Sequence, residues 1–207
     1  MSASAPDISV KPKRAFRLDL KTVGPLLALA LLVLLGISLN ENFLSYNNLT
    51  NVLARSSFIG IIAIGATFVI TAGGLDLSVG SMAAVIAGIM IMVMNWLIPS
   101  LGIGWSVVLA GMVTGILLGG VAGVFNGLMI TRGRIEAFIV TLGTMGIFRS
   151  LVTFLADGGT LSLNFNVADV YRPVYYDGLM GVPWPIIVFA LVAIGGEIAM
   201  RYTAFGR

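Results

Sequence analysis

The side chains best suited to chemistry or binding lie in one short segment, GGLDLSVGS at residues 73–81. It places a carboxylate, Asp76, and a hydroxyl, Ser78, directly after two glycines that end an apolar run. If a helix begins here, its first backbone amides have no partner inside the helix, and they carry partial positive charge. An acceptor oxygen is stabilising at such a position, so we expect Asp76 or Ser78 to cap the following helix.

Catalysis and metal binding have few candidate residues. The sequence contains no histidine and no cysteine. Disulfides, thiolate nucleophiles, histidine metal sites and Ser-His-Asp triads are therefore excluded. No acidic pair recurs within the apolar runs, so an intramembrane enzyme would lack its catalytic groups. We predict no catalytic residue and no metal site.

Composition indicates what surrounds the chain. Of the 207 residues, 58% are hydrophobic and only 10% are charged, and the mean hydropathy is +1.03. A soluble domain usually carries about 25% charged residues, so this chain cannot cover a water-facing surface and is expected to lie in lipid. The net charge is only +3 and the basic residues form no stripe, which argues against nucleic acid as a partner.

Apolar stretches long enough to cross a bilayer define the expected fold. A span needs roughly 20 residues at about 1.5 Å each. We predict an all-α, polytopic transmembrane helix bundle with about six spans and one glycine-interrupted break at Gly73 and Gly74. The second span is short in this prediction, and residues 40–54 and 156–181 are polar connections. The predicted spans are 23–39, 55–71, 77–98, 103–130, 137–155 and 182–200.

The distribution of basic residues predicts the orientation. Lysine and arginine favour the cytoplasmic side, and most of them fall on one side when the N-terminus is inside. Under this orientation the three tryptophans, Trp96, Trp105 and Trp184, all lie at outer helix ends, as interfacial tryptophans should. Residues 1–22 are then a cytoplasmic basic segment and residues 23–207 the membrane domain. The inner face carries Lys11, Lys13, Arg14, Arg17, Lys21, Arg132, Arg134, Arg201 and Arg207.

A glycine stripe in the fourth span predicts close helix packing. Small residues at every fourth position let helix backbones approach in lipid. The third span has a smaller version in Gly80, Ala84 and Gly88. The stripe could serve simple packing or form a surface that slides during function, and the sequence leaves both open. Its members are Gly111, Gly115, Gly119, Gly123 and Gly127.

The segment 73–81 resembles the GGIDLSVGS signature of ribose-type ABC permeases, the membrane subunits that import monosaccharides. Four further runs resemble stretches of the same family: FLSYNNL at 43–49, FVIT at 68–71, Asn126-Gly127 with RGR at 132–134, and AFIVTLGT at 137–144. The resemblance covers nearly the whole chain. Members of the family are longer, so the resemblance implies that this chain lacks the C-terminal part of the permease domain.

The resemblance implies a multi-pass protein of the bacterial inner membrane that carries a sugar of the ribose, xylose or galactose class. Its implied partners are a second permease subunit, an ABC ATPase subunit and a periplasmic or lipid-tethered sugar-binding protein. ATP is bound by the partner ATPase, and this chain holds no cofactor. In relatives, the run ending at Gly206 and Arg207 opens the loop that docks on the ATPase. Together with Arg132, Arg134 and Glu136 it is the expected ATPase-contact side.

Several polar residues have two readings. Asp76 is either a cap alone or a cap that also lines or gates the substrate path, because broken helices in transporters border such paths. Asn126 either bonds across helices or touches sugar. Arg149, inside the fifth span, either snorkels to the interface or takes part in the path. The candidate path or gate residues are Gly73, Gly74, Asp76, Ser78, Gly80, Asn126 and Arg149.

Other functions remain open at this point. A small substrate-capture subunit of a vitamin transporter would match the length and the number of spans, but it leaves the signature at 73–81 unexplained. A channel would predict ion currents. Autoinducer and branched-chain amino-acid permeases belong to the same import family and are further alternatives.

Overall fold

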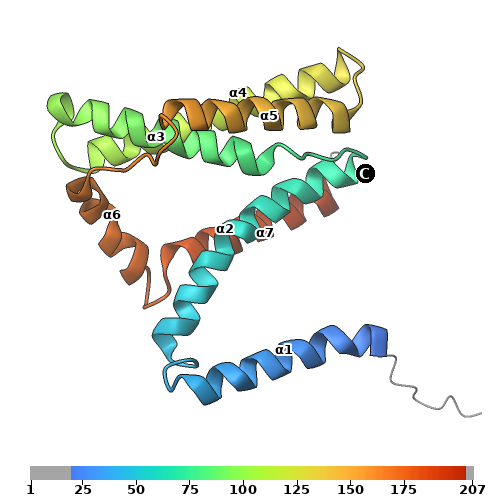
Figure 1. Ribbon diagram of the computed structural model, residues 1–207, viewed down its shortest axis with the longest axis vertical. Coiled ribbons are helices and arrows are strands. Elements are labelled where there is room, and N and C mark those ends of the chain that lie inside the picture. Colours follow the sequence, from blue (N-terminus) through green and yellow to red (C-terminus); the bar gives the residue numbers. More distant parts are fainter. Residues whose placement is uncertain (1–19, 204–207) are drawn as a thin grey trace, which may run out of the picture. The chain divides into compact units, whose positions relative to one another are not determined.

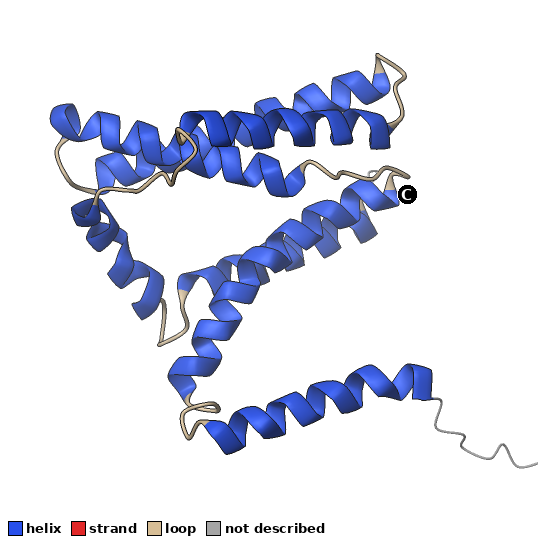
Figure 2. Cartoon of the chain, in the orientation of Figure 1, coloured by secondary structure: helices blue, strands red, loops and turns tan. Residues whose placement is uncertain are grey.

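The computed structural model describes residues 20–203, with side chains from Val23 onward, and these residues form helices and connections without a β-strand (Figures 1 and 2). The helices of this part of the chain are α1 (Leu20–Leu39), α2 (Tyr46–Thr71), α3 (Val79–Leu101), α4 (Trp105–Thr131), α5 (Ala137–Leu155), α6 (Phe165–Asp177) and α7 (Trp184–Tyr202).

The chain divides into two compact units, residues 1–49 and 50–207. In the first unit, α1 is apolar, and the Phe43 ring lies against Gly36, in the space that a side chain at that glycine would need. The Asn48 side-chain amide donates to the Phe43 carbonyl at 2.7 Å. These contacts fold the connection 40–45 back onto the end of α1, which is where the sequence predicts that the first apolar stretch ends.

The start of α2 differs from the prediction. The helix begins at Tyr46, not at residue 55, because the Ser45 hydroxyl accepts the backbone N–H of Asn48 at 3.3 Å and so caps the first turn. The polar residues that suggested a connection therefore belong to the helix, and Arg55 lies within it. With 26 residues α2 is long for a membrane span, so the prediction of a short second span was wrong.

The core of the second unit is an antiparallel pair, α3 and α4, joined by part of the predicted glycine stripe. A Cβ added at Gly111 would lie 2.7 Å from Met94, and one at Gly115 would lie 2.5 Å from the Met90 sulfur. At Gly119 the nearest atom, on Ile86, is 3.8 Å away. Close approach therefore uses one half of the stripe. Gly123 and Gly127 have no atom within 4 Å of such a Cβ.

Helix α5 packs against another face of α3, where Gly88 makes the close approach. A Cβ at Gly88 would lie 2.9 Å from Leu161 and 3.6 Å from Val152 of α5. Gly80, the other glycine of the smaller motif, has open space around it. Helix α3 is thus sandwiched between α4 and α5, and its small residues serve packing at one position of the motif only.

Helix α6 was not predicted, since residues 156–181 were expected to be a connection. Its Asn164 cap accepts the backbone N–H of Asn166 at 3.0 Å. One side chain of α3, Asn95, donates to the Ser162 carbonyl and accepts from the Asn164 backbone N–H, both at 2.9 Å. Val167 of α6 is fully buried in the cluster formed with Met94, Val107 and Val108. Residues 165–177 therefore form a short helix despite their largely polar sequence, and its one apolar face packs against the bundle.

Helices α2 and α7 approach through glycines and aromatic rings. The Phe189 ring of α7 lies against Gly60, and a Cβ at Gly196 would lie 3.0 Å from Ile64 of α2. Phe58 of α2 stacks on Tyr175 of α6, with ring centroids 6.3 Å apart. Tyr175 therefore links α6 to α2.

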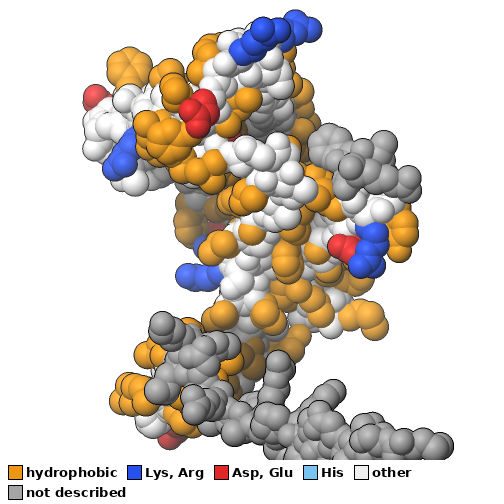
Figure 3. Space-filling view, turned by 90° about the vertical axis from the view of Figure 1, so that its right-hand side faces the viewer, with side chains coloured by type: hydrophobic (Ala, Val, Ile, Leu, Met, Phe, Trp, Pro, Cys, Tyr) orange, Lys and Arg blue, Asp and Glu red, His pale blue; other side chains and the backbone are white. Residues whose placement is uncertain are grey.

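Five of the described helices, α2, α3, α4, α5 and α7, are long and apolar enough to cross a membrane, and Val23–Leu39 is a shorter apolar helix. Apolar side chains cover much of the face drawn in Figure 3. The prediction of an all-α, polytopic helix bundle is confirmed. The chain is a multi-pass membrane protein.

Candidate functional site

The glycine pair after α2 forms a helix stop. Gly73 takes a left-handed conformation with φ of 81°, which favours glycine. Its N–H donates to the Ile70 carbonyl at 2.9 Å, and the Gly74 N–H donates to the Val69 carbonyl at 2.9 Å. This pair of bonds is the Schellman arrangement, which satisfies the last carbonyls of a helix. The predicted break at Gly73 and Gly74 is confirmed and has a local structural cause.

A chain of three polar side chains follows the break. The Asp76 carboxylate accepts two bonds on one oxygen, from the Ser78 backbone N–H at 2.8 Å and from the Ser78 hydroxyl at 2.6 Å. The same hydroxyl accepts the side-chain N–H of Asn126, on α4, at 3.0 Å. Ser78 is fully buried and Asn126 is 5% exposed. The prediction that Asn126 bonds across helices is confirmed.

The predicted capping role of Asp76 needs a correction. Helix α3 begins at Val79 with Ser78 as its N-cap residue, and no side-chain cap bond is made there. The Asp76 carboxylate instead fixes the cap residue itself, because its bonds go to the amide and hydroxyl of Ser78. Asp76 thus positions the residue from which α3 starts, and the first amides of α3 are left without a side-chain acceptor.

The connection 72–78 is also tied to α5. The Thr141 hydroxyl lies 2.8 Å from the Ala137 carbonyl and 3.2 Å from the Leu75 carbonyl, so its one proton is shared between them. Thr141 is 1% exposed. The connection therefore contacts α2, α4 and α5 within a few residues. The sequence analysis missed Thr141, because the same span also contains Thr144, Ser150 and Thr153 and nothing in the sequence distinguishes one of these hydroxyls from the others.

The hydrogen-bonded group of Asp76, Ser78 and Asn126 is called the junction below. One of its polar atoms has no partner among the described residues. The side-chain carbonyl oxygen of Asn126 is buried and accepts no hydrogen bond. A buried acceptor without a partner costs about 1–3 kcal/mol. No atom lies within 4 Å of the Cβ positions of Gly80, Gly123 and Gly127, and Gly80 and Gly123 are exposed, so these glycines lie at the surface of the bundle. The junction is thus a buried hydrogen-bond network with one unpaired oxygen.

Arg149 is not part of this junction. It is exposed on α5, about two turns beyond Thr141 towards the other end of the helix. Its backbone carbonyl accepts the Thr153 hydroxyl at 2.9 Å. The structure therefore brings together Gly73, Gly74, Asp76, Ser78 and Asn126 of the candidate path or gate residues, and it leaves Arg149 apart.

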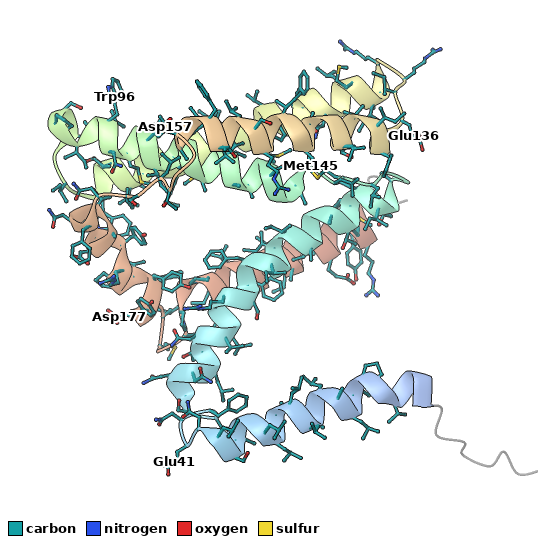
Figure 4. The ribbon with its side chains drawn as sticks, viewed as in Figure 1. Glu41, Trp96, Glu136, Met145, Asp157 and Asp177 are labelled. Atoms are coloured by element: carbon teal, nitrogen blue, oxygen red, sulfur yellow. The ribbon has the colours of Figure 1, made fainter. Side chains whose placement is uncertain are left out.

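The expected ATPase-contact residues lie in one connection. Arg132 and Arg134 precede Glu136, which is the residue before α5, and all three are exposed. The start of α3, the end of α2 and this connection lie at the same end of the second unit (Figures 1 and 4). Gly206 and Arg207 lie outside the described residues.

A cleft in the second unit is apolar. It has a volume of about 720 Å³ and is lined by α2, α3, α4, α6 and α7. Met90, Met94, Trp105 and Tyr175 are among its walls. A neutral polar cargo would lose its hydrogen bonds to water there and gain few in return, so this cleft is a poor path for a sugar.

The glycine-ended helices, the polar junction and the apolar surface define a membrane-embedded helix bundle of the transporter type. The model of the family described as "Branched-chain amino acid transport system / permease component" matches residues 48–207. The chain belongs to this family.

Curated relatives agree with the family match. The ribose import permease protein RbsC of Bacillus subtilis is 35% identical over 194 residues, which are 91% of this chain and 56% of the relative. RbsC of Haemophilus influenzae is 32% identical, over 87% of this chain and 54% of the relative. The autoinducer 2 import system permease protein LsrC of Salmonella paratyphi B is 33% identical, over 88% and 49%. The chain spans about half the length of these relatives. No solved structure matches.

Proposed function

We propose that the chain is the membrane-spanning permease subunit of an ATP-driven importer whose cargo is a monosaccharide. The observation that carries this proposal is the similarity to ribose import permeases, which extends over 91% of the chain for the relative from Bacillus subtilis. The helix bundle and the absence of catalytic groups in the sequence fit a subunit that conducts cargo while another subunit hydrolyses ATP.

The proposal includes the partners and the orientation. A bacterial inner membrane holds the chain with its N-terminus in the cytoplasm, a second permease subunit lies beside it, and an ATPase docks at the end that carries Arg132, Arg134 and Glu136. A periplasmic or lipid-tethered binding protein delivers the sugar at the other end, near α6. Trp105 and Trp184 begin their helices at that end, which supports the orientation because tryptophan favours membrane interfaces.

Within this subunit, we assign the junction of Asp76, Ser78 and Asn126 to gating. The junction lies at the break between α2 and α3, where the connection 72–78 meets α4 and α5. Transporters often place broken helices at the substrate path. The hydrogen bonds of the junction hold the start of α3 against α4, so breaking them would release the start of α3.

A second cargo is supported by one observation. The autoinducer 2 permease of Salmonella paratyphi B is 33% identical to this chain, close to the identity of the ribose permeases. The second candidate cargo is therefore autoinducer 2.

Uptake by whole cells tests the proposal. The chain is produced with the ATPase and the binding protein encoded beside its gene, in cells that lack their own ribose, xylose and galactose uptake. Labelled monosaccharide should accumulate only when all three proteins are present and the ATPase is active. Uptake of autoinducer 2 in place of every sugar would overturn the cargo assignment, and no chain-dependent uptake at all would overturn the permease assignment.

A further inference from the structure

Helix α5 has two different faces. One face packs on α3 and holds the buried residues Val140, Thr141 and Thr144. Met145 lies on the side of α5 that faces α3 (Figure 4). The opposite face is exposed along the whole helix, and nothing in the described part of the chain covers it.

The half of this exposed face towards α6 is polar. Residues at helical spacing of three and four share one face, and this spacing relates Arg149, Ser150, Thr153 and Asp157. They line a groove of about 520 Å³ together with Phe154 and Gly158. Phe154 is 80% exposed. In the described residues, neither the Arg149 guanidinium nor the Asp157 carboxylate forms an ion pair.

Asp157 is held in place by the end of α5. Its φ is 50°, in the left-handed region, where glycine is the usual residue. The Asp157 N–H donates to the Phe154 carbonyl at 3.0 Å, and the Gly158 N–H donates to the Thr153 carbonyl at 3.0 Å. This is the same helix stop that ends α2 at Gly73 and Gly74. An aspartate in the glycine position is less favourable for the backbone, and it places a carboxylate at the rim of the groove.

Lipid is a poor environment for this face. A guanidinium and two hydroxyls within a span are costly in hydrocarbon, and such residues normally face a water-filled cavity or another polar group. In two parallel copies related by a two-fold axis along the membrane normal, Arg149 would lie at the same depth in both. Close packing of the two faces would bring like charges together, so water between them is the favourable arrangement.

We propose that the groove formed by Arg149, Ser150, Thr153 and Asp157 is a weak binding site for the hydroxyl groups of a monosaccharide, on the wall of a water-filled path. A guanidinium donates several hydrogen bonds in one plane, a carboxylate accepts them, the Ser150 hydroxyl does both, and the Thr153 hydroxyl, whose proton goes to the Arg149 carbonyl, accepts. This set matches neighbouring sugar hydroxyls, and the Phe154 ring offers an apolar surface for the C–H face. The inference rests on the proposed function, since it names where that cargo binds.

The volume and the chemistry agree with this assignment. Small-molecule sites usually enclose about 300–1,000 Å³, and the groove falls within that range. The larger cleft between α3 and α7 falls there too, but its hydrogen-bonding side chains are limited to two tyrosines and two tryptophans, and none of its side chains is charged. Of these two hollows, the groove on α5 is the one that offers both a guanidinium and a carboxylate to a polyhydroxylated cargo.

The test uses the absence of cysteine from the sequence. Single cysteines are introduced as Ser150→Cys and Thr153→Cys in the full chain, which is then placed in lipid nanodiscs. A charged, water-soluble thiol reagent reports whether each position meets water. Leu109→Cys, at an exposed apolar position of α4, is the control for a surface in contact with lipid, and each variant is first checked for a monodisperse elution profile.

Both groove cysteines should react at least about tenfold faster than the Leu109→Cys control, because the thiolate forms readily only in contact with water. D-ribose, D-xylose or D-galactose should slow the reaction at Ser150→Cys, to about half when the sugar concentration equals its dissociation constant. The additional change Arg149→Gln should remove this protection. Reaction at the rate of the control, or fast reaction that none of the three sugars slows, would overturn the inference.

Cell uptake separates this result from the proposed function. If the wild-type chain supports monosaccharide uptake but the cysteines are not protected, the cargo binds elsewhere and only the present inference fails. If no monosaccharide is taken up, the proposed function fails. If Arg149→Gln leaves sugar uptake at the wild-type level over the whole concentration range, the groove is not a cargo site.

Discussion

Asn126 donates a hydrogen bond to the Ser78 hydroxyl at 3.0 Å, while its own side-chain carbonyl oxygen is buried without a partner. The two residues are 48 positions apart and join the start of α3 to α4. One side chain therefore stabilises this contact through its N–H and weakens it through its oxygen. Substitutions at Ser78 and at Asn126 should therefore change the stability of the protein by different amounts.

Ser78→Ala should destabilise the protein. The substitution removes the hydroxyl that donates to Asp76, while the backbone N–H of residue 78 remains. It also leaves the whole Asn126 amide buried without a partner, at a cost of about 1–3 kcal/mol. Asn126→Leu should change the stability much less, because it removes the unpaired oxygen together with the bond and keeps a side chain that branches at Cγ. Thermal unfolding of both variants in the same detergent tests the difference. A larger loss for Asn126→Leu than for Ser78→Ala would contradict this account of the junction.

Asp76→Asn should keep most of the fold but lower transport. Asparagine can still accept the two bonds from Ser78, yet charge-assisted hydrogen bonds are roughly twice as strong as neutral ones, so the start of α3 is held less firmly. We expect a small loss of thermal stability and a reduction in sugar uptake of about tenfold if the weaker bonds cost about 1.4 kcal/mol in the transport step.

The matched measurement is uptake by the complete importer with equal amounts of wild-type and variant protein in the membrane. Asp76→Glu serves as the control that keeps the charge but moves it. A fully active Asp76→Asn importer would show that Asp76 only positions Ser78 and has no part in gating.

Gly111→Ala should destabilise the α3–α4 pair, whereas Gly123→Ala should not. The added methyl at Gly111 would lie 2.7 Å from Met94, which is itself buried. Overpacking of this kind costs about 1–3 kcal/mol. The same methyl at Gly123 meets no atom within 4 Å and improves helix propensity by up to about 1 kcal/mol. Thermal unfolding of the two variants gives the comparison, and equal destabilisation would show that the whole stripe is packed.

Gly73→Ala tests the backbone at the end of α2 without steric complication, because no atom lies within 4 Å of the added methyl. A non-glycine residue in the left-handed region costs about 1–2 kcal/mol, so the variant should unfold at a lower temperature. Gly65→Ala is the matched control, since it lies inside the same helix and also has open space around it. It should be neutral or stabilising. A neutral Gly73→Ala would indicate that the connection 72–78 has another conformation available.

Element type and much of the site could be predicted from the sequence because membrane spans are long, apolar and bounded by charge. The span 137–155 matches α5 in full, since Glu136 and Asp157 flank a mainly apolar run in which Arg149 is the one charged residue. The start of α2 was missed because a serine cap and two asparagines resemble a loop, and α6 was missed because it is short and largely polar.

Contacts between distant positions could not be predicted in this way. The pairing of Ser78 with Asn126 depends on the register of α3 against α4, which a single sequence does not specify. The glycine stripe predicted close packing on α4 but could not reveal that the contact uses Gly111 and Gly115 and leaves Gly123 free. Nor did the sequence reveal that Asp76 would bond to Ser78 and leave the first amides of α3 uncapped.

Helix α3 is anchored near both of its ends by side-chain hydrogen bonds that join it to a neighbouring helix or to a connection. Near one end Ser78 joins it to Asn126, and near the other Asn95 holds the two backbone groups on either side of Leu163. A rigid rod fixed in this manner acts as a lever. A tilt of α3 that loosens the grip at Ser78 must also pull on the segment leading into α6, so events on the two sides of the membrane are mechanically connected through a single helix.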